Sequence, residues 1–247
     1  MKTLVSRLPC SASDSSYSIN TMTKFGFAKR SFQLLEELHD NNNREWFQPH
    51  KQEIRELLQD PFADLLEVTS RKLKNARRPM SGSKQTMFRM NRDVRFSKDK
   101  RPYSEHVSGL LTPSGFKKDD TALLYAHLAA DGGFIAAGFY QLETRVLNFF
   151  RDRILEDAKQ FRTITKKLLK SGYEFAQFEP LKSMPRGYSQ YSDHEHAPYL
   201  KLKSLVVTQN QTPNVWIDGT IVNQLVKLHK ASTPLLEFGL DAIRAGL

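Results

Sequence analysis

The segment TALLYAHLAADGGFIAAGFYQ, residues 121–141, constrains the fold more than any other part of the sequence. Two apolar stretches flank Asp131, Gly132 and Gly133, and glycine is the residue that adopts positive φ angles without steric cost. This pattern predicts a β-hairpin with a tight turn, and therefore an antiparallel sheet. The small residues at 136–138 indicate that another backbone, a helix or a ligand lies close to the second strand.

Helical periodicity dominates the rest of the sequence. Ser31 is expected to cap the first helix, Asp60 and Pro61 to begin the third, and Gly172 to end the fifth. Apolar residues three or four positions apart predict helices over residues 31–39, 44–59, 60–73, 142–154, 161–169, 221–229 and 234–243.

The strands and helices together indicate the fold class. Residues 88–96 and 204–208 are expected to be strands, and residues 181–200 a loop. Because helices outnumber strands and a hairpin supplies the sheet, we expect an α+β fold. It would be a single globular domain over residues 23–247, an antiparallel sheet with a central hairpin covered by several helices. The serine-rich residues 1–22 are expected to be a disordered leader or a targeting segment outside this domain.

Positive charge is concentrated in one window of the chain. The net charge is +10, and residues 71–101 contain twelve lysines or arginines and two aspartates, a local excess of ten. The rest of the chain is therefore balanced. A local positive field favours phosphates, nucleic acids, acidic surfaces or carboxylate ligands, although many charged segments serve only solubility.

The segment RMNRDVRFSKDKRPY, residues 89–103, places six basic residues around two aspartates. On the expected strand, Asp93 would lie on one face with two arginines and orient a guanidinium group toward a carboxylate or phosphate. If the protein also turns its ligand over, the candidate catalytic residues are Asp93, Ser97 and Tyr103. We expect an anion-binding pocket whose ligand contacts come from Arg89, Arg92, Arg95, Lys98 and Lys100.

A second segment, LKSMPRGY, could complete this pocket with Lys182, Arg186 and Tyr188. The expected ligand is an anionic, phosphorylated small molecule or a nucleotide. Three alternatives stay open. The basic segment could brace its loop through internal ion pairs, the 71–101 window could be an exposed patch that binds nucleic acid without catalysis, or the domain could be a scaffold for an acidic partner protein.

Other chemistries have weaker support. Ser97 and Lys100 fit the S-x-x-K pattern of penicillin-interacting enzymes, but that pattern needs a helix at the serine and a later K-T-G strand, and no K-T-G occurs. His194 and His196 are the candidate metal ligands, with His127 as a third, but solitary histidines more often serve structure and we expect no metal. No P-loop or G-x-G-x-x-G motif is present, so the sequence identifies no cofactor.

An aromatic pair follows the asparagines at 41–43. Trp46 and Phe47 could stack on nucleic-acid bases, but an amphipathic helix more often buries such a pair in the core. We expect the core position, and we expect the asparagines to end the preceding helix.

The cysteine content bears on the cellular compartment. The single cysteine, Cys10, excludes an internal disulfide framework and favours a reducing environment. We expect a cytoplasmic protein unless the serine-rich leader directs it to an organelle. No stretch approaches the roughly 18 apolar residues of a membrane-spanning helix, so we expect no membrane partner.

Several motifs occur in a characteristic order: NNNREWF, RMNRDVRFSKDKRPY, the hairpin followed by LNFFRDRI, LKSMPRGY, and DHEHAPYLKLKS. This order resembles the conserved family catalogued as domain of unknown function 2461, over roughly residues 31–241. The resemblance implies one globular domain and supplies no activity that could be carried over. Members usually have Asp-His-Pro where this chain has Asp193, His194 and Glu195, which weakens a functional role for His194.

Overall fold

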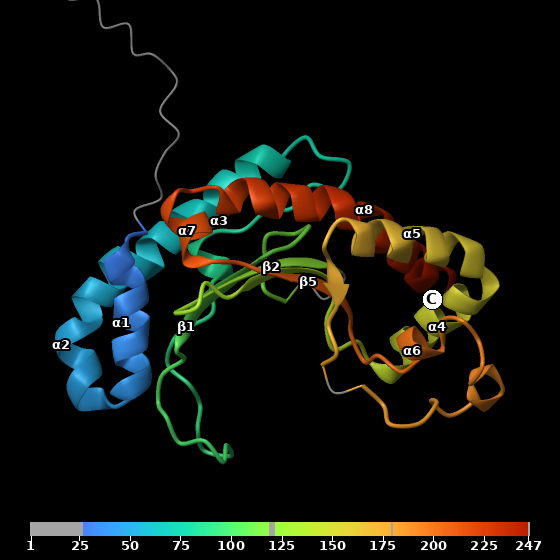
Figure 1. The fold of residues 1–247 in the computed structure, drawn as a ribbon, viewed down its shortest axis with the longest axis horizontal. Helices are drawn as coiled ribbons and strands as arrows, with labels where there is room; N and C mark the ends of the chain where they lie inside the picture. Colours follow the sequence, from blue (N-terminus) through green and yellow to red (C-terminus); the bar gives the residue numbers. More distant parts are fainter. Residues whose placement is uncertain (1–26, 119–121, 179, 247) are drawn as a thin grey trace, which may run out of the picture.

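The computed structural model describes residues 27–118, 122–178 and 180–246, and its centre is a five-stranded antiparallel sheet (Figure 1). The predicted hairpin is confirmed as the pair β2–β3, and its turn uses Gly132 and Gly133 at φ angles of 104° and 70°. The strand order is β1-β2-β3-β5-β4. The strands are β1 (His106–Leu111), β2 (Leu123–Ala129), β3 (Phe134–Phe139), β4 (Glu174–Phe175) and β5 (Leu205–Asn210).

Helices make up the rest of the regular structure, so the predicted single-domain α+β class is confirmed. A π-helical turn, Arg55–Gln59, joins α2 to α3, and short 3₁₀ turns lie at Lys84–Thr86 and Ser189–Tyr191. The helices are α1 (Lys29–Asp40), α2 (Arg44–Ile54), α3 (Asp60–Leu73), α4 (Thr144–Glu156), α5 (Ala158–Lys170), α6 (Ala197–Leu200), α7 (Pro213–Ile217) and α8 (Ile221–Gly246).

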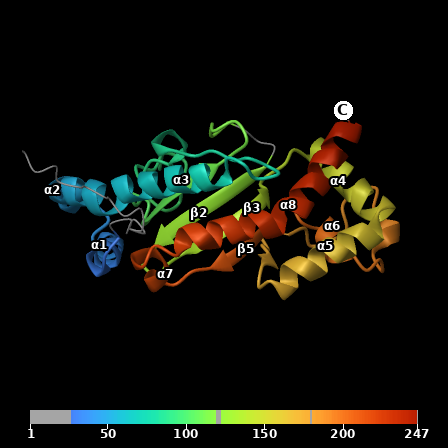
Figure 2. The same ribbon diagram turned by 90° about the horizontal axis from the view of Figure 1, so that it is seen from above.

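Helices α3 and α8 cover one face of the sheet (Figures 1 and 2). Gly109 in β1 permits this contact, because an added Cβ atom would lie 2.8 Å from Leu66 of α3. In α8, a Cβ atom on Gly239 would lie 2.3 Å from the ring of Phe150 in α4 and 2.5 Å from that of Phe139 in β3. The core therefore lies between the sheet and these two helices, with α4 packed at one end.

No described helix covers the opposite face of the sheet (Figure 1). Alternate residues of β2 are buried, so its remaining side chains point to this second face and are half-buried. We use the name open face for the surface formed there by His106, Tyr125, His127 and Phe134. These four residues come from three neighbouring strands.

The expected start of the third helix is confirmed, since α3 begins at Asp60 with Pro61 in its first turn, but Asp60 is itself helical and is not a cap. The chain stays helical from α2 through α3, and the Asp60 N–H donates to the carbonyl of Arg55, five residues earlier. Pro61 has no N–H to give to a helical carbonyl, and a π-helical turn accommodates the local mismatch in the hydrogen-bond ladder. The two regions that we expected to be separate helices therefore form one continuous helical path.

The two expected closing helices, 221–229 and 234–243, are one helix, α8, with Pro234 inside it. The hydroxyls of Ser232 and Thr233 donate to the carbonyl of His229, at 3.2 and 2.8 Å. Buried residues on both sides of the proline, including Leu228 and Leu235, pack into the core and keep the helix continuous. Tertiary packing here outweighs the cost of an internal proline.

The expected strand at 88–96 is wrong, because the segment is irregular and has one isolated bridge, between Asn91 and Tyr103. The strand next to the hairpin is instead β1, which no clear alternation of apolar residues had indicated. Strand 204–208 is confirmed as β5, and the expected helix end at Gly172 is confirmed by its φ of 78°. Ser31 is not the cap of α1, since that helix begins at Lys29 and the Ser31 hydroxyl accepts the N–H of Ala28.

The serine-rich leader and Cys10 lie outside the described residues. Within the parts of the chain that the structure describes, no helix combines the length and the apolar character that crossing a bilayer requires.

Candidate anion-binding site

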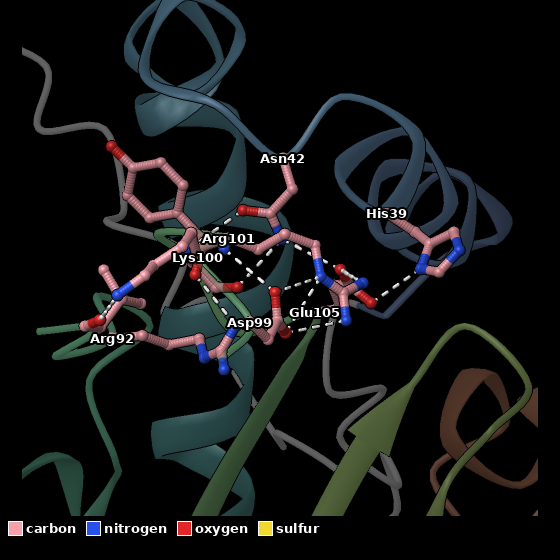
Figure 3. A network of polar contacts seen from close by, with 9 residues as sticks. His39, Asn42, Arg92, Asp99, Lys100, Arg101 and Glu105 are labelled. Carbon is pink, nitrogen blue, oxygen red and sulfur yellow. Dashed lines mark hydrogen bonds and ion pairs between the residues drawn. The ribbon is translucent and has the colours of Figure 1, made fainter. Parts of the chain in front are cut away.

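The segment 89–103, called the basic loop below, is held by ion pairs with its own aspartates (Figure 3). Arg92 Nη1 donates to Asp99 Oδ2 at 2.8 Å, and Arg101 Nη2 donates to the same oxygen at 2.9 Å. These hydrogen bonds, above all those from Arg101, lower the pKa of Asp99 far below its ordinary value. This arrangement is the bracing alternative that the sequence left open.

The base of the basic loop is fixed to the α1–α2 connection (Figure 3). Asn42 forms two hydrogen bonds with the backbone of Tyr103, at 2.9 and 3.0 Å, and the Tyr103 ring stacks on Phe47 at 3.6 Å. Glu105 accepts a hydrogen bond from Asn42 at 3.0 Å and contacts His39 Nδ1 at 2.7 Å. The asparagine motif therefore positions the basic loop, a role beyond ending a helix.

The remaining basic side chains of the loop are not gathered around one point. Arg95 is 78% exposed and grips Asp93 with two hydrogen bonds, at 3.0 and 2.7 Å. Lys100 Nζ donates to backbone carbonyls at the tip of the loop. Arg89 and Lys98 are exposed, and neither forms an ion pair with a described carboxylate.

The contacts of the three candidate catalytic residues stabilise the loop or the core. The hydrogen bonds from Arg95 lower the pKa of Asp93, which makes this carboxylate a weaker base. The Ser97 N–H closes a turn on Val94, so Ser97 does not open the helix that the S-x-x-K pattern requires. Tyr103 is 5% exposed and lies against the core.

The basic window 71–101 is divided between two sides of the molecule. The end of α3 and the residues after it lie on the helical face, where Arg77 pairs with Glu237 of α8 at 2.5 Å. The basic loop extends beyond the sheet on the opposite side (Figure 1). The window therefore does not form one continuous patch.

The second half of the expected pocket is not beside the first. The loop that carries Lys182, Arg186 and Tyr188 lies at the far end of the sheet from the basic loop (Figure 1). Residues 181–187 instead face α4. Across this contact lies a cavity of about 850 Å³ lined by Gln141, Leu142, Thr144, Leu147, Asn148, Arg151, Leu181, Ser183, Met184, Pro185, Arg186, Gly187 and Lys203.

The lining of this cavity, called the α4 pocket below, is positive. It contains Arg151, Arg186 and Lys203, and none of its described lining residues is acidic. Thr144, the first residue of α4, also lines it, so the helix end with its partial positive charge faces the cavity. Lys182 is exposed in the same loop without lining the cavity.

Arg151 is the unusual residue of the α4 pocket, because it is charged and only 4% exposed. Its Nε donates to the carbonyl of Leu200 at 2.9 Å and its Nη1 to Oδ1 of Asn148 at 2.8 Å. Among the described residues its Nη2 has no hydrogen bond, and no carboxylate forms an ion pair with it. Burial lowers the pKa of Arg151, since desolvation destabilises the charged form. Asp152 acts electrostatically on Arg151 without forming an ion pair with it, so an anion in the pocket would supply a counter-charge in direct contact.

The ring of Tyr188 packs near the guanidinium of Arg151. Tyr188 is 7% exposed, and the Arg151 guanidinium lies 5.7 Å from its ring centroid. The Tyr188 hydroxyl donates to Asp152 Oδ1 at 2.7 Å. Burial, together with this hydrogen bond, raises the pKa of Tyr188, so the phenol stays protonated. One oxygen of the Asp152 carboxylate, which acts electrostatically on Arg151, is thus already occupied.

The backbone at the entrance to α4 is strained. Gln141 is the one described non-glycine residue at positive φ, 49°, and its N–H donates to the hydroxyl of Ser204 at 2.9 Å. Such conformations are costly and cluster at functional sites. Gln141 lines the α4 pocket, which is therefore built partly from a backbone shape that local preference disfavours.

The histidines of the DHEH segment have structural contacts. His196 is 3% exposed, and its Nε2 contacts the carbonyl of Ala158 at 2.9 Å. The rings of His194 and His196 lie 5.5 Å apart, and His127 lies on the open face of the sheet. No group of three or more histidine, cysteine or acidic side chains that could hold a metal ion occurs among residues 27–118, 122–178 and 180–246.

Phe47 is buried, as expected for a core residue, and cannot stack on a base. Trp46 is half-buried, packs against the core and stacks on His50 at 4.1 Å. Asn43 caps α2 by accepting the Trp46 N–H at 2.9 Å. The pair therefore belongs to the packing of α2.

The fold and this cavity define a class: a single-domain α+β protein with a positively lined pocket at one end of its sheet. A family model described as conserved hypothetical protein (DUF2461) matches residues 30–238, so the chain belongs to that family, as its motifs indicated. No curated protein and no solved structure matches the chain.

Proposed function

We propose that this protein binds an anionic, phosphorylated small molecule or nucleotide in the α4 pocket. The observation that carries the proposal is the buried Arg151, which faces a cavity and has no ion-pair partner among the described residues. Leaving a buried charge unpaired is costly, and a bound anion removes that cost. The anion-binding role expected for the basic loop is thus assigned to a different set of residues.

The composition of the α4 pocket suits such a ligand. A volume of about 850 Å³ is in the range of pockets that hold drug-sized ligands. Arg151 would bind an anionic oxygen through its Nη2, while Arg186 and Lys203 line the cavity around it. Leu142, Leu147 and other apolar residues line the rest, so the ligand would carry an uncharged portion beside its anionic group.

The proposal concerns binding, and turnover is a separate matter. None of the candidate catalytic residues Asp93, Ser97 and Tyr103 lines the α4 pocket. Of the ligand-contact residues expected from the sequence, Arg186 lines it and Tyr188 supports it.

A thermal-shift panel of nucleotides and sugar phosphates tests the proposal. Saturating a site at about 100 times its Kd stabilises the folded state by about 2.7 kcal/mol, which is a measurable rise in Tm. We expect a subset of phosphorylated compounds to raise the Tm of the wild type and not of Arg151→Met. Arg145→Met is the matched control, because Arg145 is exposed on the same helix and does not line the pocket.

Two outcomes would contradict the proposal. In one, no anionic compound shifts the Tm of the wild type. In the other, Arg151→Met responds as the wild type does. If an acidic protein alone stabilised the wild type, the scaffold alternative would replace the pocket.

A further inference from the structure

The tip of the basic loop holds an aromatic ring out in solvent. Phe96 is 95% exposed, and the Arg95 guanidinium lies 5.8 Å from its ring centroid. A hydrogen bond from the Ser97 N–H to the Val94 carbonyl, 3.3 Å, closes the turn at the tip. Lys100 Nζ donates to the same carbonyl at 3.1 Å. The loop's own bonds therefore maintain the exposure of this ring.

The base of the basic loop adjoins the open face of the sheet. His106 begins β1, and both Arg92 and Glu105 of the network in Figure 3 act electrostatically on it. The His106 ring stacks on His127 at 4.1 Å, and His127 stacks on Phe134 at 4.6 Å. A row of flat rings thus crosses three strands.

Tyr125 extends this row toward the edge of β1. Its hydroxyl contacts His127 Nδ1 at 3.0 Å, and its ring lies 6.3 Å from that of Phe88, which is 45% exposed. Lys117 Nζ lies 5.9 Å from the Phe88 ring. At this border, Lys117 therefore lies close to the exposed ring of Phe88, as Arg95 lies close to the ring of Phe96 in the basic loop.

The charge of the basic loop is only partly neutralised by the loop itself. The loop contains six basic residues and two aspartates, and both carboxylates already form ion pairs with arginines. Arg89 and Lys98 are exposed and have no ion-pair partner among the described residues. Two cations on this loop are therefore available to external anions.

We propose that the basic loop and the open face together bind single-stranded nucleic acid. Bases would stack on Phe96 and on Phe88, and would contact the outer rings of the row, because His106 and Phe134 already cover both faces of the His127 ring. Arg89 and Lys98 would contact phosphates. Aromatic platforms beside cationic grooves bind single strands because unpaired bases offer free ring faces. A lipid surface could use Phe96 and the cations but not half-buried rings on a sheet, so nucleic acid accounts for more of the surface.

This inference goes beyond the proposed ligand of the α4 pocket, because the two surfaces lie at different ends of the sheet (Figure 1). Fluorescence anisotropy with a labelled oligouridylate of about 12 nucleotides tests it. We expect Phe96→Ala to weaken binding at least about fivefold, the usual effect of losing one stacked base. Phe96 contributes almost no buried surface, so the variant should fold normally.

The controls separate stacking, charge and the α4 pocket. Phe116→Ala removes another exposed ring, 63% exposed and outside the basic loop, and should leave binding unchanged. Lys98→Ala should reduce the slope of log affinity against log salt by about 0.7, the effect of one phosphate contact on a single strand. Arg151→Met should bind the oligonucleotide as the wild type does.

The proposal is overturned if the wild type gives no saturable binding, or if Phe96→Ala binds as tightly as the wild type. Duplex RNA bound as tightly as the single strand would also overturn it. The same holds if the wild type binds phosphatidylserine vesicles and not the oligonucleotide.

Discussion

At the scale of single residues, the proposal of anion binding in the α4 pocket depends on Arg151. The sequence contains a signal for it, because this arginine lies four positions after Leu147 and beside Phe150 on the apolar stripe of the predicted helix. A charged residue on a buried stripe needs a partner. Asn148, one turn earlier on the same helix, is a partner that helical spacing could indicate, but the carbonyl of Leu200 reaches the guanidinium only through the tertiary fold.

Replacing Arg151 by methionine should separate stability from binding. The two lost hydrogen bonds cost about 1 kcal/mol each, and removing a desolvated, unpaired charge offsets that loss. We expect the free energy of unfolding to change by less than about 2 kcal/mol while the Kd for a phosphorylated ligand rises about 10- to 100-fold. Urea denaturation and isothermal titration of the same samples measure both. A variant that unfolds at ordinary temperature would show that Arg151 is purely structural.

The buried His127 should make the free energy of unfolding depend on pH. Burial lowers its pKa from 6.5 to about 4, so between these values the unfolded chain binds more protons than the folded one. Stability should therefore be constant above about pH 6.5 and fall as the pH drops toward 4, by roughly 2–3 kcal/mol from this residue. In urea denaturation at a series of pH values, His127→Phe should flatten this decline. An unchanged pH profile in the variant would contradict the assignment.

At the scale of elements, the hairpin was predictable and the basic loop was not. The hairpin depends on local turn chemistry, with glycines at 132 and 133. In the loop, the alternation of apolar residues predicted a strand, but the carboxylates of Asp93 and Asp99 accept the N–H groups two residues further on, at 3.3 and 3.1 Å. These side-chain turns compete with strand pairing and bend the backbone.

Asp99 should hold the basic loop in shape without contributing much to global stability. In Asp99→Asn, Arg92 and Arg101 lose their shared charged partner. We expect backbone amides of residues 91–103 to exchange with deuterium several-fold faster, while the global Tm changes little, because exposed ion pairs contribute weakly. Asp93→Asn is the control, since the ion pair that Asp93 forms among the described residues is with Arg95 near the tip. Equal exchange in Asp99→Asn and wild type would contradict the bracing role.

At the scale of the whole molecule, the sequence indicated the fold class and the family but not which segments meet. The α4 pocket combines residues 141–151, residues 181–187 and Lys203, three regions separated in sequence. The motif at 182–188 suggested one side of a pocket, and only the fold shows that α4 forms the other. The continuity of α8 through Pro234 likewise depends on packing against the sheet, α4 and α3.

The substitution Gly239→Ala tests how closely α8 packs against α4 and β3. A Cβ atom there would meet the rings of Phe150 at 2.3 Å and Phe139 at 2.5 Å, so Gly239→Ala forces α8 away from α4 and β3. We expect a loss of roughly 1–3 kcal/mol in the free energy of unfolding, despite the higher helix propensity of alanine. Denaturant titration measures the change. A stabilised variant would show that α8 does not pack this closely.

The central claim is that the α4 pocket binds an anion through Arg151. Native mass spectrometry of freshly purified protein, after incubation with a mixture of nucleotides and sugar phosphates, tests it most directly. The account predicts a one-to-one adduct of a phosphorylated compound on the wild type and on Arg145→Met, and its absence from Arg151→Met. An adduct that persists on Arg151→Met, or a wild type that carries none, would contradict it.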